Sequence, residues 1–160
     1  QVLRQERAES LYETMNALAV SAPRGADGLR CEPFFAGSRA EPGRRAVFTG
    51  VSAENFTPAH MVRALLEGMA TAFYEGYEQI RAVTGSACSR LVGAGNGLRE
   101  NPALAQVMSA EFGLPLAFPA HREEAAYGAA LVAACGAGLW PDLATAGRVI
   151  RYEHQKRIGG

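Results

Sequence analysis

The sequence predicts one α/β domain in which helices flank a short mixed sheet, and three features of the chain carry this prediction. Apolar residues recur at helical intervals in several long segments. Short runs with strand character lie between those segments. Glycine and proline gather where helix and strand would meet, at positions where the chain must turn.

The N-terminal part of the chain is expected to form a helix followed by two strands. Helical periodicity covers residues 6–20 and ends where proline and glycine cluster. Residues 29–35 and 46–51 have the length and composition of strands. The segment between them, 37–45, is rich in glycine, proline and charge, which indicates a surface loop. The two strands are therefore candidates for pairing.

A long amphipathic helix is expected next. Thr57 and Pro58 form a typical helix start, in which a capping hydroxyl precedes proline at the first helical position. The helical pattern then continues to about Val83. The apolar residues that step by four along it are Met61, Leu65, Met69, Phe73 and Tyr77. We expect this stripe to lie in the core.

The second half of the chain alternates short strands with helices. The expected elements are a strand over 90–93, a helix over 101–112, a strand over 114–118, a helix over 123–139 and a short helix over 141–149. Residues 1–150 are therefore expected to form one lobe. Residues 151–160 are polar and end in Gly-Gly, so we expect a flexible tail there.

Composition argues against several classes of function. Among the 160 residues, sixteen basic side chains balance sixteen acidic ones, so the chain lacks the positive charge typical of proteins that bind nucleic acid or anionic membranes. Cys31, Cys88 and Cys135 lie far apart and form no disulfide or metal-ligand pattern. No apolar run reaches the roughly 18–20 residues of a membrane span. We therefore expect a soluble, cytoplasmic protein without a metal site in this chain.

A glycine-rich turn is the most informative local feature. Gly93, Gly95 and Gly97, with Asn96 and Asn101, lie between a predicted strand and a predicted helix. Exposed backbone N–H groups in such a turn can meet a polar ligand, which makes nucleotide binding the functional hypothesis. The spacing matches neither the GxGxxG of dinucleotide-binding folds nor the GK[ST] of a Walker loop. Local features alone favour the alternative, a plain connecting turn in which Asn101 caps the next helix.

Two longer stretches carry an ordered series of motifs. In residues 33–70 the landmarks are Gly37, Arg39, Pro42, Arg63, Ala64, Glu67 and Gly68. In residues 91–138 the glycine turn precedes a helix of small residues, marked by Glu124, Ala126, Gly128, Ala129, Ala130 and Ala133. The series resembles the C-terminal lobe of FGGY carbohydrate kinases over about residues 8–140. The G-x-G-x-x-L-x-x-N form of the turn and the N-F-T-x-x-H stretch at 55–60 are most similar to sedoheptulokinases.

The resemblance implies an actin-like ATPase (ribonuclease H-like) fold in a two-lobed kinase that holds ATP and a sugar between its lobes. Gly93, Gly95, Asn96, Gly97 and Asn101 would then line the nucleoside pocket. The implied reaction uses ATP and Mg²⁺ to phosphorylate a ketose hydroxyl, converting sedoheptulose to sedoheptulose 7-phosphate. Xylulose and ribulose are the alternative substrates.

No catalytic residue is expected in this segment. Asp27 and Asp142 have the settings of turn or helix-terminus residues, and His60, His121 and His154 lack a partner at catalytic spacing. The resemblance implies that the catalytic aspartate, the phosphate loop and most sugar contacts belong to the N-terminal lobe and the segment joining the lobes, and that the Mg²⁺ ligands lie mainly outside this segment. We therefore expect the segment to be cut from a longer kinase and to be inactive alone. The alternative is a non-catalytic actin-like nucleotide-binding or interaction module.

Overall fold

Helices and short strands alternate along the chain. The computed structural model describes residues 2–154, and for residues 2–10 and 154 the backbone only. The α-helices are α1 (Val2–Ser21), α2 (Pro58–Thr84), α3 (Asn96–Arg99), α4 (Pro102–Phe112), α5 (Glu124–Gly136) and α6 (Leu143–Ala146), with 3₁₀ turns η1 (Ala26–Gly28) and η2 (Gly147–Val149). The strands are β1 (Arg30–Glu32), β2 (Val47–Thr49), β3 (Leu91–Val92), β4 (Leu116–Pro119) and β5 (Tyr152–His154). The predicted α/β class is confirmed.

The strands form two sheets. β1 and β2 pair, as expected, and the structure shows that they run antiparallel, with Cys31 opposite Phe48. β3, β4 and β5 lie side by side in that order, parallel between β3 and β4 and antiparallel between β4 and β5. This second sheet is short and mixed, as predicted.

The C-terminal strand corrects one prediction. The expectation of a flexible tail over 151–160 is wrong for Tyr152–His154, which pairs with β4. The N–H of Ala120 also donates to the carbonyl of Arg151 at 2.8 Å. Polar composition suggested a tail, but an edge strand is held by backbone hydrogen bonds and tolerates charged side chains. Residues 155–160 lie outside the described residues.

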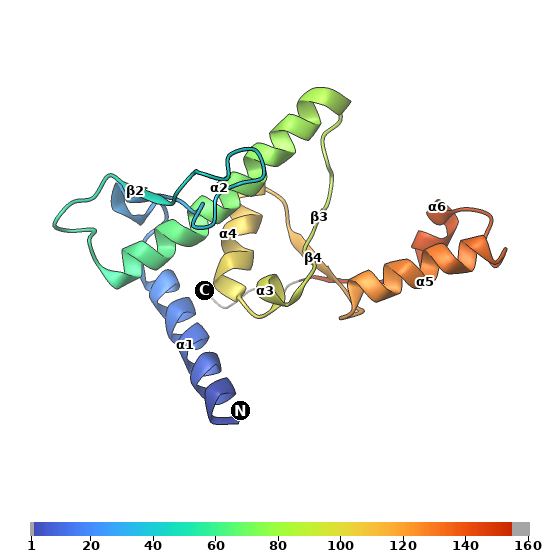
Figure 1. Ribbon diagram of the computed structural model, residues 1–160, viewed down its shortest axis with the longest axis horizontal. Coiled ribbons are helices and arrows are strands. Elements are labelled where there is room, and N and C mark those ends of the chain that lie inside the picture. The colour runs from blue at the N-terminus through green and yellow to red at the C-terminus, as the bar shows by residue number, and fades with distance from the viewer. Residues whose placement is uncertain (1, 155–160) are drawn as a thin grey trace.

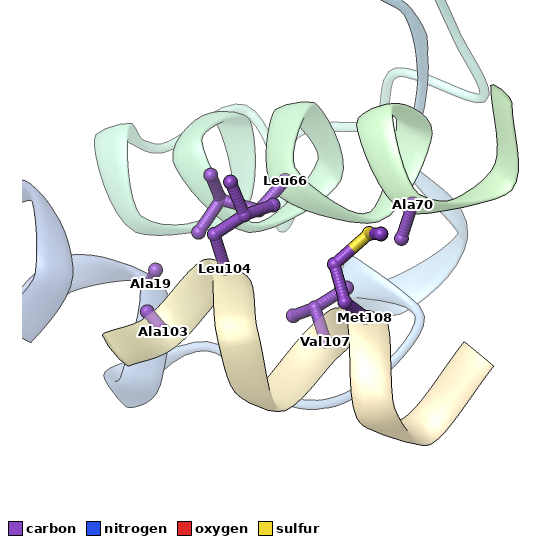
Figure 2. Packing of buried hydrophobic residues seen from close by; sticks show 7 residues of the cluster. All are labelled: Ala19, Leu66, Ala70, Ala103, Leu104, Val107 and Met108. Atoms are coloured by element: carbon purple, nitrogen blue, oxygen red, sulfur yellow. The ribbon is translucent and has the colours of Figure 1, made fainter. Parts of the chain in front are cut away.

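The main core lies between α2 and α4 (Figure 2). Leu66 of α2 packs beside Leu104 of α4, and Ala70 lies beside Met108. Burial of one aliphatic side chain of this size contributes about 1.5–3 kcal/mol to folding. The buried cluster consists of Ala19, Leu66, Ala70, Ala103, Leu104, Val107 and Met108.

Helix α2 begins and ends as its sequence indicates, but its apolar stripe is only partly buried. Thr57 Oγ1 accepts the N–H of His60 at 3.3 Å, and Gly85 ends the helix with φ 66°. Met61 and Leu65 pack against a buried cluster, as expected, whereas Phe73 is 61% exposed. Steps of four advance about 40° around a helix of 3.6 residues per turn, so successive members of the stripe face different neighbours. Tyr77, at the end of the stripe, still packs on Phe112 of α4, with ring centroids 5.6 Å apart.

Helix α5 extends away from the α2–α4 core (Figure 1). Among its described side chains only Leu131 is buried, and a Cβ atom built on Gly128 would meet nothing within 4 Å. The first turn of α5 carries Glu124, which bonds to the end of α3. The glycine turn and the start of α5 are thereby held together.

Candidate nucleoside site

Gly93 lies beneath the glycine turn, at the end of β3. It is buried, and its N–H donates to the carbonyl of Ala117 in β4 at 2.9 Å. A Cβ atom at this position would come 2.6 Å from Cδ2 of Leu98 and 2.9 Å from Cε1 of Phe118. Gly93 therefore lets the turn pack onto the sheet.

Gly95 turns the chain into α3, a one-turn helix that the sequence analysis did not predict. Its φ of 87° and ψ of 153° suit glycine and few other residues. Its carbonyl accepts the N–H groups of Leu98 at 3.3 Å and Arg99 at 3.2 Å. Asn96 and Gly97 follow on the exposed side, and Cβ atoms built on Gly95 and Gly97 would meet nothing within 4 Å. The turn thus presents an open stretch of backbone.

Asn101 has the capping role that local features favoured. Its Oδ1 accepts the N–H of Leu104 at 2.9 Å, and Pro102 is the first residue of α4. Among the described residues nothing bonds to its Nδ2. Capping therefore uses the side-chain oxygen and leaves the amide nitrogen as a donor.

Arg99 and Glu124 form an ion pair that joins the turn to α5. Glu124 Oε1 accepts from Nε of Arg99 at 3.1 Å and from Nη2 at 2.7 Å. The two side chains are 17% and 19% exposed. The hydrogen bonds from Arg99 lower the pKa of Glu124. The backbone N–H groups of Glu124 and Gly95 lower it further. Sequence reasoning missed this pair because its members lie in separate elements with no local pattern linking them.

Arg99 also reaches the loop that leaves β4. Its Nη2 donates to the carbonyl of Pro119 and, at 3.2 Å, to that of His121. Because β3 and β4 are parallel, their carboxyl ends lie at one edge of the sheet, where ligands of open α/β sheets bind. The ring of His121 stacks on Tyr127, with centroids 3.8 Å apart. Two loops at this edge are therefore tied together by one guanidinium group.

A cleft of about 830 Å³ lies elsewhere, between β1, α2 and α4. No residue of the glycine turn lines it. Two ion pairs occupy its wall: Arg63 Nε to Glu67 Oε1 at 2.6 Å, and Arg44 Nη2 to Glu32 Oε2 at 2.9 Å. Glu67 also accepts the N–H of Gly25 at 2.9 Å. These four charged side chains are therefore paired within the protein.

The aspartates take the expected structural roles. Asp142 caps α6 by accepting the N–H of Thr145 at 2.6 Å. Asp27 lies in a turn with φ 48°, and its carboxylate lies 2.9 Å from Nε2 of His60. His60 Nδ1 in turn lies 2.7 Å from Oγ1 of Thr57. The expectation that His60 lacks a nearby partner is therefore wrong, because this histidine bridges Thr57 and Asp27 at the start of α2.

The described residues include no group of three or more His, Cys, Asp or Glu side chains that could hold a metal ion. No helix in the part of the chain that the structure describes is both long and apolar enough to cross a bilayer.

Comparison with known sequences places the chain in a family. The model of the FGGY family of carbohydrate kinases, C-terminal domain, matches residues 1–137. A xylulose kinase of Staphylococcus epidermidis is 32% identical over 138 residues, which is 84% of this chain and 27% of that protein. A glycerol kinase of Myxococcus xanthus is 33% identical over 79% of this chain and 25% of that protein. The chain thus spans about a quarter of these relatives.

Solved structures show the same fold. The xylulose kinase of Rhodospirillum rubrum superposes with a TM-score of 0.75 at 32% identity, covering 97% of this chain and 31% of that one. The ligand-bound xylulose kinase of Lactobacillus acidophilus superposes with a TM-score of 0.79 at 22% identity, covering 88% of this chain and 29% of that one. The actin-like fold is confirmed, while the closer likeness to sedoheptulokinases stays a prediction. The chain belongs to the FGGY family of carbohydrate kinases, within their C-terminal domain.

Proposed function

We propose that this chain holds the nucleoside of ATP in a carbohydrate kinase whose full chain phosphorylates a ketose. One observation carries the proposal: the open turn over residues 95–97 lies at the carboxyl edge of β3 and β4, in a chain of a kinase family. Backbone without covering side chains at that edge is suited to a planar, polar ligand.

Each residue of the turn has its own part in this proposal. Gly95 and Gly97 let a base or ribose lie directly against the backbone. The amide of Asn96 and Nδ2 of Asn101 offer hydrogen bonds to polar edges of the nucleoside. Gly93 anchors the turn to the sheet, because its N–H donates to the carbonyl of Ala117 in β4.

When bound, ATP supplies the phosphoryl group, and the residues of this chain bind and orient its nucleoside. The described residues include no cluster of three or more His, Cys, Asp or Glu side chains that could hold a metal ion, and we assign no step to Mg²⁺ here. The catalytic base, the Mg²⁺ ligands and most sugar contacts are proposed for the N-terminal lobe of the full-length protein, the intramolecular partner of this domain.

The proposed sugar is sedoheptulose, with sedoheptulose 7-phosphate as product. The form of the glycine turn and the stretch at residues 55–60 support this choice. Xylulose is the second candidate, because proteins named xylulose kinase are 32% identical to this chain both among curated sequences and among solved structures.

The test is ADP release by the full-length protein with sedoheptulose, xylulose, ribulose or glycerol as acceptor. We expect ketose-dependent turnover, with the highest kcat/KM for sedoheptulose. Highest kcat/KM for xylulose would correct the substrate and keep the reaction. ADP binding without turnover on any acceptor would favour a non-catalytic module, and absence of nucleotide binding would overturn the proposal.

A further inference from the structure

We propose that Arg99 and Glu124 are positioning residues that hold the glycine turn in its nucleotide-binding shape. The inference rests on the proposed function, because it concerns the same turn. The two side chains meet at 2.7 Å between Arg99 Nη2 and Glu124 Oε1, and each is less than a fifth exposed.

The reason that the turn needs such a pair lies in its local structure. Helix α3 has four residues, and so short a helix is marginal without tertiary contacts. Gly95 precedes it and Gly97 lies within it, and glycine gives the backbone more freedom than any other residue. The turn therefore holds one shape only if something outside it fixes the end of α3.

Arg99 is the last residue of α3, and its bonds fix that end on two sides. Its guanidinium donates to Glu124 at the start of α5 and to the carbonyl groups of Pro119 and His121 after β4. Its backbone N–H donates back to the carbonyl of Gly95 at 3.2 Å. Fixing Arg99 thus fixes α3, and through α3 the position of residues 95–97.

The pair acts by preorganisation, because a turn already in its bound shape loses less conformational entropy when a ligand binds. Glu124 is negative, so it does not attract the phosphates of the ligand. Loss of the pair should therefore weaken the binding of adenosine and the binding of ADP by the same factor. If Arg99 instead contacted a phosphate directly, its loss would weaken the binding of ADP and leave the binding of adenosine unchanged.

The experiment measures the Kd of ADP and of adenosine by calorimetry on the full-length protein, with steady-state kinetics for ATP and sugar. The variants are Arg99→Met, Arg99→Lys and Glu124→Gln. We expect Arg99→Met and Glu124→Gln to raise both Kd values and the KM for ATP about tenfold, equivalent to about 1.4 kcal/mol, with the KM for the sugar unchanged. Arg99→Lys should keep only part of the wild-type nucleotide affinity, because lysine lacks the planar guanidinium group that donates several hydrogen bonds at once.

The matched control is the ion pair between Arg81 and Glu78 on the surface of α2, where Nη2 and Oε2 lie 2.8 Å apart. Arg81→Met should leave both Kd values unchanged. Unchanged Kd values in folded Arg99→Met and Glu124→Gln, with only a lower Tm, would show a purely structural pair. If Arg99→Met does not fold, Glu124→Gln decides, since it keeps the side-chain shape. Failure of the wild-type protein to bind any nucleotide would overturn the proposed function, and the positioning role with it.

Discussion

A Cβ atom on Gly93 would lie 2.6 Å from Cδ2 of Leu98, so glycine at residue 93 lets the Leu98 side chain of α3 pack directly over the end of β3. We expect Gly93→Ala to lower the free energy of unfolding by about 1–3 kcal/mol through overpacking against Leu98 and Phe118. Thermal unfolding of the full-length protein measures this change. Gly97→Ala is the control, because its Cβ would meet nothing within 4 Å and should leave stability equal or slightly higher.

Asn101→Ala should remove the cap of α4 and lower the free energy of unfolding by about 1 kcal/mol. Asn101→Asp keeps an oxygen that can accept the N–H of Leu104 but has no amide donor. We therefore expect Asn101→Asp to retain stability and still to bind ADP more weakly than the wild type. Urea unfolding and calorimetry give the two quantities, and full ADP affinity in Asn101→Asp would remove Nδ2 from the proposed site.

The Arg99–Glu124 pair should make stability depend on pH in the acid range. Its hydrogen bonds lower the pKa of Glu124 in the folded protein. The contribution of the ion pair to the free energy of unfolding is therefore fully present above the pKa of glutamate in the unfolded chain, about 4.3. This contribution is lost as the pH falls through the lower pKa of Glu124 in the folded protein. Glu124→Gln should be less stable than wild type at pH 7, and the two should converge on acidification. A stability difference that stays constant with pH, measured by urea unfolding, would contradict this account.

Asn55 is 1% exposed and bonds three backbone groups around the base of the β1–β2 hairpin. Its Nδ2 donates to the carbonyls of Asp27 at 3.0 Å and Gly50 at 2.9 Å, and its Oδ1 accepts the N–H of Ser52 at 2.8 Å. Asn55→Ala should lower the free energy of unfolding by about 3 kcal/mol, because buried partners are left unsatisfied. The neighbouring Phe56→Ala, at a 64% exposed position, should change it by less than about 0.5 kcal/mol.

The cysteines should differ in reactivity. Cys31 is buried, and burial, aided by the negative charge of Glu32, raises the pKa of its thiol. Cys88 is exposed. Because the thiolate is the reactive form, Ellman's reagent should label Cys88 rapidly and Cys31 only on unfolding. The Cys88→Ser variant should lose the rapid phase, and rapid labelling of Cys31 in that variant would contradict its buried position.

The sequence predicted the α/β class, the start of α2 at Pro58 and the end of α4 at Gly113, because caps, prolines and helical periodicity act over a few residues. It also located the glycine turn and, through the order of the motifs, the family. The apolar stripe of α2 was only partly predictable. Helical periodicity identifies an apolar face, but it does not show which parts of that face a neighbouring element covers.

The role of each residue in the turn depends on tertiary contacts, which the local sequence pattern does not contain. Gly93 is a packing residue and Asn101 a cap because of atoms brought near from β4 and α4. β5 became a strand because β4 offers it a free edge. Arg99 and Glu124 meet across 25 positions of sequence, and no local pattern encodes a contact between side chains that only the packing of two loops at one sheet edge brings within 2.7 Å.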